Sequence, residues 1–233
     1  AANHPDLIPT LLAALRGQQV LTPWVAAKAL GKLGEAAASP PDLIPTLLAA
    51  LRGQQGLIPW VAAEALGKLG AAAAANPEVV PALLAALKAG SSPAGRALGD
   101  LGEAAAAHPE VVPTLVAALR DEDWLVREGA AAALARLGEG AAAHPEVILA
   151  IVNALRDEYE MVRRAAAVAL GTLGEAAARK PQCLAAIFDL VQRDKNSAFG
   201  ALAHWDRQGL RTFETENGFT VRSIAELTAS SRA

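Results

Sequence analysis

The chain has 233 residues, of which 53% are hydrophobic but only 4% aromatic, and its formal net charge is −3. This balance gives no electrostatic footprint for nucleic acid or an anionic membrane surface, and no run of about 18 apolar residues predicts a membrane span. The single cysteine, Cys183, excludes an internal disulfide and is expected in the core. With no signal-peptide pattern, these features predict a cytoplasmic protein.

One sequence unit is repeated five times, with a step of 36 residues except once, where the step is 32. The repeats open on Pro5, Pro41, Pro77, Pro109 and Pro145, and they close on Leu33-Gly34, Leu69-Gly70, Leu101-Gly102, Leu137-Gly138 and Leu173-Gly174. A fixed period of this size is typical of a solenoid, in which neighbouring repeats bury each other's apolar faces. We therefore predict an all-α fold, a right-handed α-α superhelix of five helical hairpins. The array is expected over 1–181, in repeats of about 4–39, 40–75, 76–107, 108–143 and 144–180.

The chain starts in the middle of the pattern. Ala1 to Asp6 is similar to the joint between later repeats, and a polar capping repeat, which solenoids normally require at their ends, is missing there. We expect residue 1 to be a cut inside a longer array, with an upstream domain missing from this chain.

Repeat four shows the expected anatomy of the first helix, helix A. Pro109 suits the first helical position, and helix A is predicted over Val111 to Arg120. A second proline, Pro113, should kink the first turn or delay the start of the helix. This second proline recurs in repeats one to three, and repeat five has Leu149 in its place.

The second helix, helix B, is predicted from about Trp124 to Leu137. Asp121-Glu122-Asp123 makes the turn and offers an N-cap, and Gly138 ends the helix. The apolar positions that define its buried face are Ala130, Ala133, Leu134 and Leu137, spaced i, i+3, i+4, i+7.

Three repeats depart from this pattern in informative ways. Repeats one and two are nearly copies and differ at five positions between 5–39 and 41–75, which recent duplication or a designed consensus array would explain. Repeat three lacks four residues in its turn and helix B, an irregularity that argues against design. Ser91-Ser92-Pro93 is expected to start a helix of roughly two turns there, and the shorter helix should change the superhelix curvature locally.

The segment 182–233 is expected to form a divergent C-terminal repeat and cap. Gln182 to Arg193 is typical of helix A of a sixth repeat. Further on, Asn217-Gly218 is compatible with a β-hairpin and also with a helix stop followed by a new helix over Val221 to Leu227.

These features carry a resemblance to a known family. The helix A proline, the aspartate of the turn and the Val-Arg pairs Val126-Arg127 and Val162-Arg163 resemble the HEAT repeat, in the short bacterial form also seen in phycobilin lyases, over residues 3 to about 193. The resemblance implies an Asp/Arg ladder between neighbouring repeats, formed here by Asp121, Arg127, Asp157 and Arg163. Repeats one and two carry Pro23 and Pro59 where the arginine should be.

The same resemblance implies that helix B lines the concave face of the solenoid. The side of helix B opposite its apolar face supplies the candidate partner-binding residues Trp24, Lys28, Lys32, Trp60, Glu64, Lys68, Glu128, Arg136 and Arg164. Trp24 and Trp60 are expected one repeat apart, roughly 10 Å, and exposed tryptophan is enriched in binding hot spots.

Other polar residues have structural explanations. His4, His108 and His144 share one position before the helix A proline, too far apart for a metal site, and are expected to cap or to be exposed. The acidic turns lack the pattern of a calcium loop, and the chain contains no phosphate loop, zinc-ligand spacing or nucleophile elbow. We expect no catalytic residue, no metal and no cofactor.

The sequence therefore predicts a non-catalytic solenoid that binds a protein or peptide or senses a ligand. Its near-identical, alanine-rich repeats resemble the arms of bacterial NACHT-type signal-transducing NTPases, which implies a fragment of a larger bacterial signalling protein. A stand-alone scaffold or designed repeat protein is one alternative, and a phycobilin-lyase-like accessory subunit is another. Binding to nucleic acid is not expected, because the groove columns mix both signs of charge.

Overall fold

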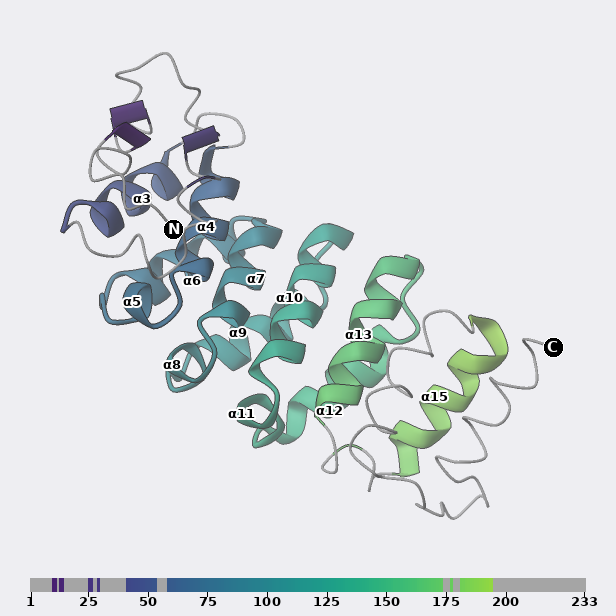
Figure 1. Cartoon of the computed structure of the whole chain (residues 1–233). Helices are drawn as coiled ribbons and strands as arrows, with labels where there is room; N and C mark the ends of the chain where they lie inside the picture. Colours follow the sequence, from purple (N-terminus) through teal and green to yellow (C-terminus); the bar gives the residue numbers. More distant parts are fainter. Residues whose placement is uncertain are drawn as a thin grey trace, which may run out of the picture. The chain divides into compact units, whose positions relative to one another are not determined.

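The computed structural model describes residues 10–11, 13–14, 25–26, 29, 41–53, 58–173, 177 and 181–194, and within them all regular structure is helical (Figure 1). Contacts divide the chain into two compact regions, Ala1–Val111 and Val112–Ala233. The first contains α3 (Leu43–Arg52), α4 (Ile58–Lys68), α5 (Ala71–Ala74), α6 (Val79–Lys88), α7 (Ser92–Asp100) and α8 (Glu103–Ala106). The helices that follow are α9 (Val111–Ala118), α10 (Trp124–Leu137), α11 (Glu139–Ala142), α12 (Pro145–Ala154), α13 (Glu160–Thr172) and α15 (Pro181–Arg193).

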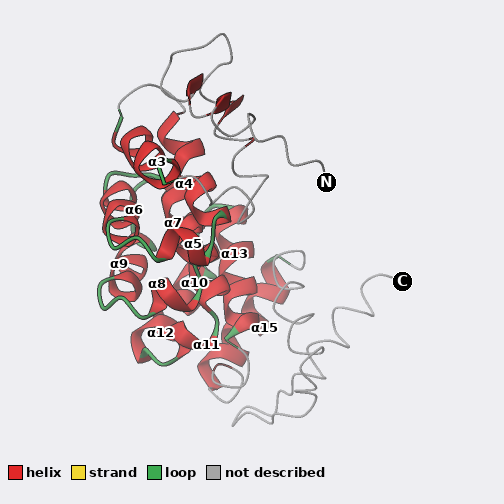
Figure 2. Cartoon of the chain, turned by 60° about the vertical axis from the view of Figure 1, so that its left-hand side comes forward, coloured by secondary structure: helices red, strands yellow, loops and turns green. Residues whose placement is uncertain are grey.

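Each compact region is built of two helix layers. In the first region, α3 packs on α6 and α4 packs on α7, while the hairpin partners α3·α4 and α6·α7 join the layers (Figure 2). In the second region, α12 packs on α15 and α10 on α13, and the hairpin α12·α13 joins the layers. Helices A therefore stack on helices A and helices B on helices B, so the predicted all-α solenoid is confirmed.

The core consists of leucine and alanine at the predicted helical spacing. Leu134 and Ala130 in α10 are fully buried, as are Leu66 and Ala62 in α4. Burial of one leucine side chain contributes roughly 1.5–3 kcal/mol, and alanine between the leucines lets neighbouring helices approach closely. In the described repeats two to five, the same face of helix B is buried.

The second proline delays the start of helix A, as predicted. Helices α3, α6 and α9 each begin two residues before that proline, whereas α12, which has Leu149 instead, begins at Pro145 itself. A proline in the first turn is tolerated because its missing N–H would have no intrahelical partner. A helix starting at Pro109 would instead need the N–H that Pro113 lacks.

The Leu-Gly pairs end helix B as expected. Gly70, Gly102 and Gly138 have positive φ values of 54°, 62° and 52°, a region that side-chain-bearing residues rarely adopt. After each of them the chain makes a one-turn helix, α5, α8 or α11, which the sequence analysis did not predict. The signal for these turns is the alanine-rich run between the glycine and the next proline.

Repeat three has the short helix B that the four-residue deficit predicted. Helix α7 has nine residues, against fourteen in α10. It packs closely on α4. The backbone of Ala97 lies so near Gly67 that a Cβ added to Gly67 would be 2.8 Å from the Cα of Ala97. The expected change of superhelix curvature stays a prediction.

The sixth repeat begins with α15 (Pro181–Arg193), where helix A was expected, and Cys183 within it is fully buried. The two alternatives for Asn217-Gly218, and the proposed cap, lie outside the described residues. Within the described part of the chain, no helix combines the length and apolar character needed to cross a bilayer.

Candidate functional site

Helix α4 presents the exposed stripe that the sequence predicts. Trp60, Glu64 and Lys68 follow each other at four-residue intervals, and all three are exposed, with 44% of Trp60 accessible. The residues Trp24, Lys28 and Lys32, expected in the same column, lie outside the described residues. The predicted pairing of Trp24 with Trp60 therefore stays a prediction.

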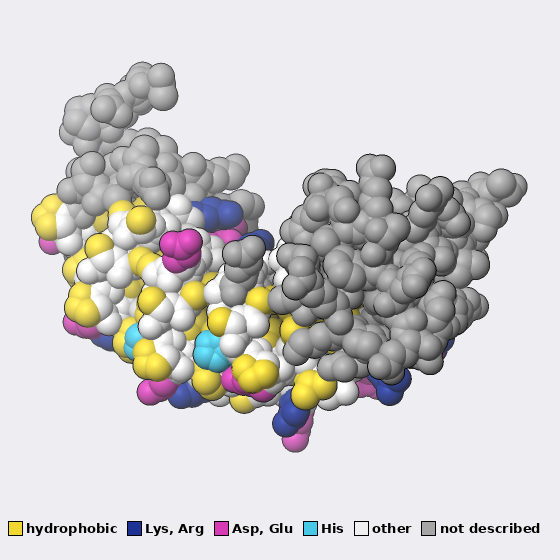
Figure 3. Space-filling view, turned by 90° about the horizontal axis from the view of Figure 1, so that it is seen from below, with side chains coloured by type: hydrophobic (Ala, Val, Ile, Leu, Met, Phe, Trp, Pro, Cys, Tyr) yellow, Lys and Arg dark blue, Asp and Glu magenta, His cyan; other side chains and the backbone are white. Residues whose placement is uncertain are grey.

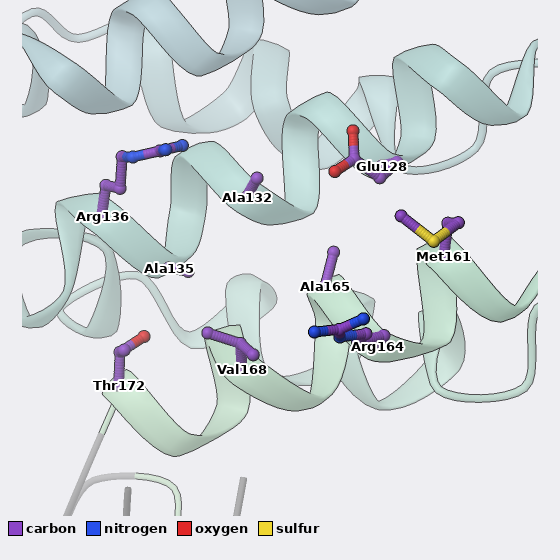
Figure 4. A pocket seen from close by; sticks show the side chains of 9 residues that line it. All are labelled: Glu128, Ala132, Ala135, Arg136, Met161, Arg164, Ala165, Val168 and Thr172. Carbon is purple, nitrogen blue, oxygen red and sulfur yellow. The ribbon is translucent and has the colours of Figure 1, made fainter. Parts of the chain in front are cut away.

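Helices α10 and α13 enclose an open groove of about 360 Å³, which we call the Met161 groove (Figure 4). It is lined by Glu128, Ala132, Ala135, Arg136, Met161, Arg164, Ala165, Val168 and Thr172. The structure thus brings together three candidate residues from two repeats, Glu128, Arg136 and Arg164. Met161 was not among the predicted residues; it lies three residues before Arg164 and so on the same helical face.

The Met161 groove combines an apolar floor with charges of both signs. Small side chains such as Ala132 and Ala165 leave the space open, and 48% of Met161 is exposed (Figure 4). Arg164 is exposed and makes no ion pair within the described part of the chain. Glu128 and Arg136 both lie on α10 and Arg164 lies on α13, so a ligand in the groove meets both signs of charge along α10 and a basic side chain on α13.

A second pocket, which we call the Trp60 pocket, lies in the first compact region and has a volume of about 420 Å³. It is lined by Leu51, Arg52, Gly53, Pro59, Trp60, Ala82, Ala85, Ala86, Ala89, Gly90 and Ser91. Trp60 therefore borders a pocket near the turns between helices A and B. Both pockets fall within the range of roughly 300–1,000 Å³ that is usual for ligand sites.

The ladder residue Arg127 joins repeat four to repeat five. Its Nε and Nη2 donate to the two carboxylate oxygens of Asp157 at 2.7 and 3.0 Å, a bidentate pair. Its Nη1 donates to the backbone carbonyls of Asp121 and Glu122 at 2.9 and 3.0 Å. Asp121 therefore takes part through its carbonyl, while its Oδ1 accepts from the Asp123 N–H at 2.9 Å.

The same arrangement recurs one repeat further along the chain. Arg163 donates from Nη2 to Asp194 Oδ2 at 2.7 Å and from Nη1 to the carbonyls of Asp157 and Glu158 at 3.0 and 2.9 Å. Asp194 was not among the predicted ladder residues. The signal for it is the Arg-Asp dipeptide that lies at or just after the end of helix A in repeats four, five and six.

The Arg127–Asp157 ion pair is largely buried, since each side chain is only 10% exposed. Burial alone would raise the pKa of Asp157, but hydrogen bonds from Arg127 and the Tyr159 N–H, with the charges of Arg127 and Arg163, hold that pKa below its usual value. The hydrogen bond to Asp157 raises the pKa of Arg127, although its own burial acts against this. Both groups are therefore ionised at neutral pH.

An aromatic pair lies beside this ladder. The rings of Trp124 and Tyr159 stack with centroids 5.3 Å apart and an interplanar angle of 11°. The Arg127 guanidinium lies over the Tyr159 ring, 5.6 Å from its centroid. The acidic turn, the arginine and the two aromatic rings thus form one continuous contact between repeats four and five.

Several polar side chains act as caps. Asp123 Oδ1 accepts from the Leu125 N–H at 2.9 Å, as predicted, and His108 Nδ1 accepts from the Glu110 N–H at 3.4 Å. Nδ1 of His144 lies 3.5 Å from a carboxylate oxygen of Glu146.

Across the described residues, no group of three or more His, Cys, Asp or Glu side chains is arranged to hold a metal ion. On the face shown in Figure 3, the described charges of both signs are scattered among apolar side chains.

The described helices form an α-solenoid, and parts of it match models of HEAT-like repeats. Family models support this directly: HEAT repeats match residues 80–145, a HEAT-like repeat matches 124–173, and the PBS lyase HEAT-like repeat matches 58–89. The segment from 58 to 173 therefore consists of HEAT-like repeats.

The chain is similar in structure to engineered proteins. A designed armadillo repeat protein in complex with the peptide (KR)4 is 15% identical, covers 100% of both chains and has a TM-score of 0.54. An engineered protein is 20% identical over 96% of this chain and 67% of its own, with a TM-score of 0.51. At these identities the likeness shows the fold alone. No curated protein matches this sequence.

Proposed function

We propose that this chain is a non-catalytic module that binds an extended segment of a partner protein along its helix B face. The observation that carries the proposal is the Met161 groove, where an exposed methionine and an alanine floor lie among charged side chains of both signs, Glu128, Arg136 and Arg164. Exposed apolar surface rimmed by polar residues is typical of interaction sites. Methionine adapts to differently shaped apolar side chains, which suits a peptide-binding surface.

Two further observations support the proposal. The groove has short side chains such as Ala132 and Ala165 on its floor, so a peptide backbone can approach both helices (Figure 4). A protein that shares the fold, the designed armadillo repeat protein, forms a complex with a peptide. The second point is an analogy at the level of fold and carries less weight than the groove itself.

A direct test is selection of peptides from a random library on the wild-type chain, followed by anisotropy titration of the selected peptides. Met161→Glu should weaken binding by about tenfold or more, because it places a charge on the apolar floor. The helical melt should stay within about 0.5 kcal/mol of wild type, since Met161 is half exposed.

The matched control is Leu149→Glu, which introduces the same charge at a 55% exposed apolar residue on helix A, α12. Binding should survive this change. Equal losses of affinity in both variants would overturn the proposal. So would peptides whose affinity does not change when Met161 or Arg164 is substituted.

The proposal is compatible with two settings, a sensing arm attached to a signalling NTPase and a free-standing cytoplasmic scaffold. Both use the same groove, so the binding test applies to either. The gene upstream of the codon for Ala1 distinguishes them. An ATPase domain encoded there favours the sensing arm, and a start codon favours the scaffold.

A further inference from the structure

The Trp60 pocket occupies the place of a missing contact of the ladder. Counted back from the Leu-Gly stop of each repeat, Arg127 corresponds to Pro59. Counted forward from the helix A proline of each repeat, Asp157 corresponds to Ala89. Pro59 and Ala89 both line the pocket, so neither member of the ion pair is present where the pocket lies.

The four-residue deficit of repeat three removes the turn that should fill this space. Only three residues, Ala89-Gly90-Ser91, connect α6 to α7, and all three are small. In repeats four and five the corresponding segments are Asp121-Glu122-Asp123-Trp124 and Asp157-Glu158-Tyr159-Glu160. Both combine three acidic residues with one aromatic residue, and in the second the aromatic residue has acidic residues on both sides.

The groups that remain in the pocket complement such a segment. The indole of Trp60 is 44% exposed and offers a ring surface, as Trp124 does to Tyr159 in the other region. Arg52 pairs with Glu78 at 2.8 Å, but their side chains are 59% and 62% exposed, so this pair is weak and Arg52 can turn to another carboxylate. Ser91 Oγ is buried and has no hydrogen-bond partner in the described part of the chain.

We propose that the Trp60 pocket binds a partner segment in which acidic residues flank a tyrosine or tryptophan, and that this segment replaces the missing turn of repeat three. The aromatic ring stacks on Trp60, a carboxylate pairs with Arg52, and a polar group of the peptide satisfies Ser91 Oγ. The inference rests on the proposed function only in that the ligand is a peptide, because the two pockets share no residue.

The chain itself supplies the probe, the acetylated and amidated tetrapeptide Asp-Glu-Tyr-Glu, with the sequence of residues 157–160. Titration into the full chain, followed by NMR of the tryptophan indole N–H signals, should shift the signal of Trp60 saturably. The signal is assigned by its disappearance in Trp60→Phe. Substitution of the probe tyrosine by alanine should weaken binding at least tenfold, and binding should weaken with salt.

The variant Ala85→Leu fills the pocket from α6 and should abolish the shift. Its control is Ala117→Leu, the same change at the corresponding exposed position of the next repeat, 32 residues further on, which should leave binding intact. Circular dichroism confirms that both variants fold, because both positions are exposed.

Three outcomes would overturn the inference: no saturable shift, an equal loss in both leucine variants, or tighter binding of an Arg-Lys peptide than of the acidic probe. If Met161→Glu no longer binds the selected library peptides but still binds the acidic tetrapeptide, the two sites act separately. Failure of the probe alone leaves the function proposed for the Met161 groove untouched.

Discussion

Repeats two and three, over 41–111, and repeats four to six, over 112–194, use one fold but different means of joining neighbouring repeats. In the second region, buried arginines such as Arg127 connect consecutive repeats through Asp157 and through turn carbonyls. In the first region, Pro59 and Ala89 stand at the corresponding positions and a pocket lies between them. There, closely packed small residues hold the helices together, as at Gly67 against Ala97.

The difference teaches that the ladder is dispensable for the fold, because the apolar pattern alone positions helices A and B in both regions. What the ladder changes is the surface beside the turns. Where it is present, arginine, carboxylate and aromatic rings fill that surface. Where it is absent, a pocket lies in the corresponding place.

The largest effect is expected from breaking the ladder. Arg127→Ala leaves the Asp157 carboxylate, 10% exposed, without its bidentate partner, and should cost about 3–5 kcal/mol of unfolding free energy. Urea unfolding followed by circular dichroism measures this. The control Arg52→Ala removes an exposed pair of the first region and should cost less than about 1 kcal/mol. Similar losses in both variants would show that burial does not separate the two kinds of pair.

A smaller effect is expected at the close contact of the first region. Gly67→Ala should destabilise the chain by about 1–3 kcal/mol, because its Cβ would lie 2.8 Å from the Cα of Ala97 in α7. Intrinsic helix propensity alone predicts the opposite, a gain of about 1 kcal/mol. The reverse change at the corresponding position of repeat four, Ala135→Gly, should cost about 1 kcal/mol through propensity. Stabilisation by Gly67→Ala in urea unfolding would contradict the close packing.

The smallest effect is the pH dependence that the ladder imparts. The folded pKa of Asp157 is lowered from an unfolded value of about 3.9, so its stabilising contribution is complete above that pH. It is lost as the pH falls through the folded pKa. Unfolding free energies measured from neutral pH into the acid range should therefore fall less steeply in Asp157→Asn. Equal slopes in wild type and Asp157→Asn would contradict this account.

The amino-acid sequence alone determined the architecture of this protein. The period, the prolines and the Leu-Gly stops predicted the helices, the delayed start at Val111 and the end at Gly138, because these features depend on backbone sterics and on hydrogen bonds within a few residues. Helical spacing also predicted which side of helix B is buried, and so placed Glu128, Arg136 and Arg164 on the opposite face. The one-turn helices such as α5 were missed, since four alanines alone carry too weak a periodic signal.

Only the tertiary structure decided which of these residues meet and where space remains. The pairing of Arg163 with Asp194, the open floor beside Met161 and the pocket beside Trp60 all arise between repeats. They depend on the distance between neighbouring helices and on the volume that a proline, an alanine or a missing turn leaves unfilled. A periodic pattern fixes the face of a helix, but the shape between two faces follows only from how their side chains pack.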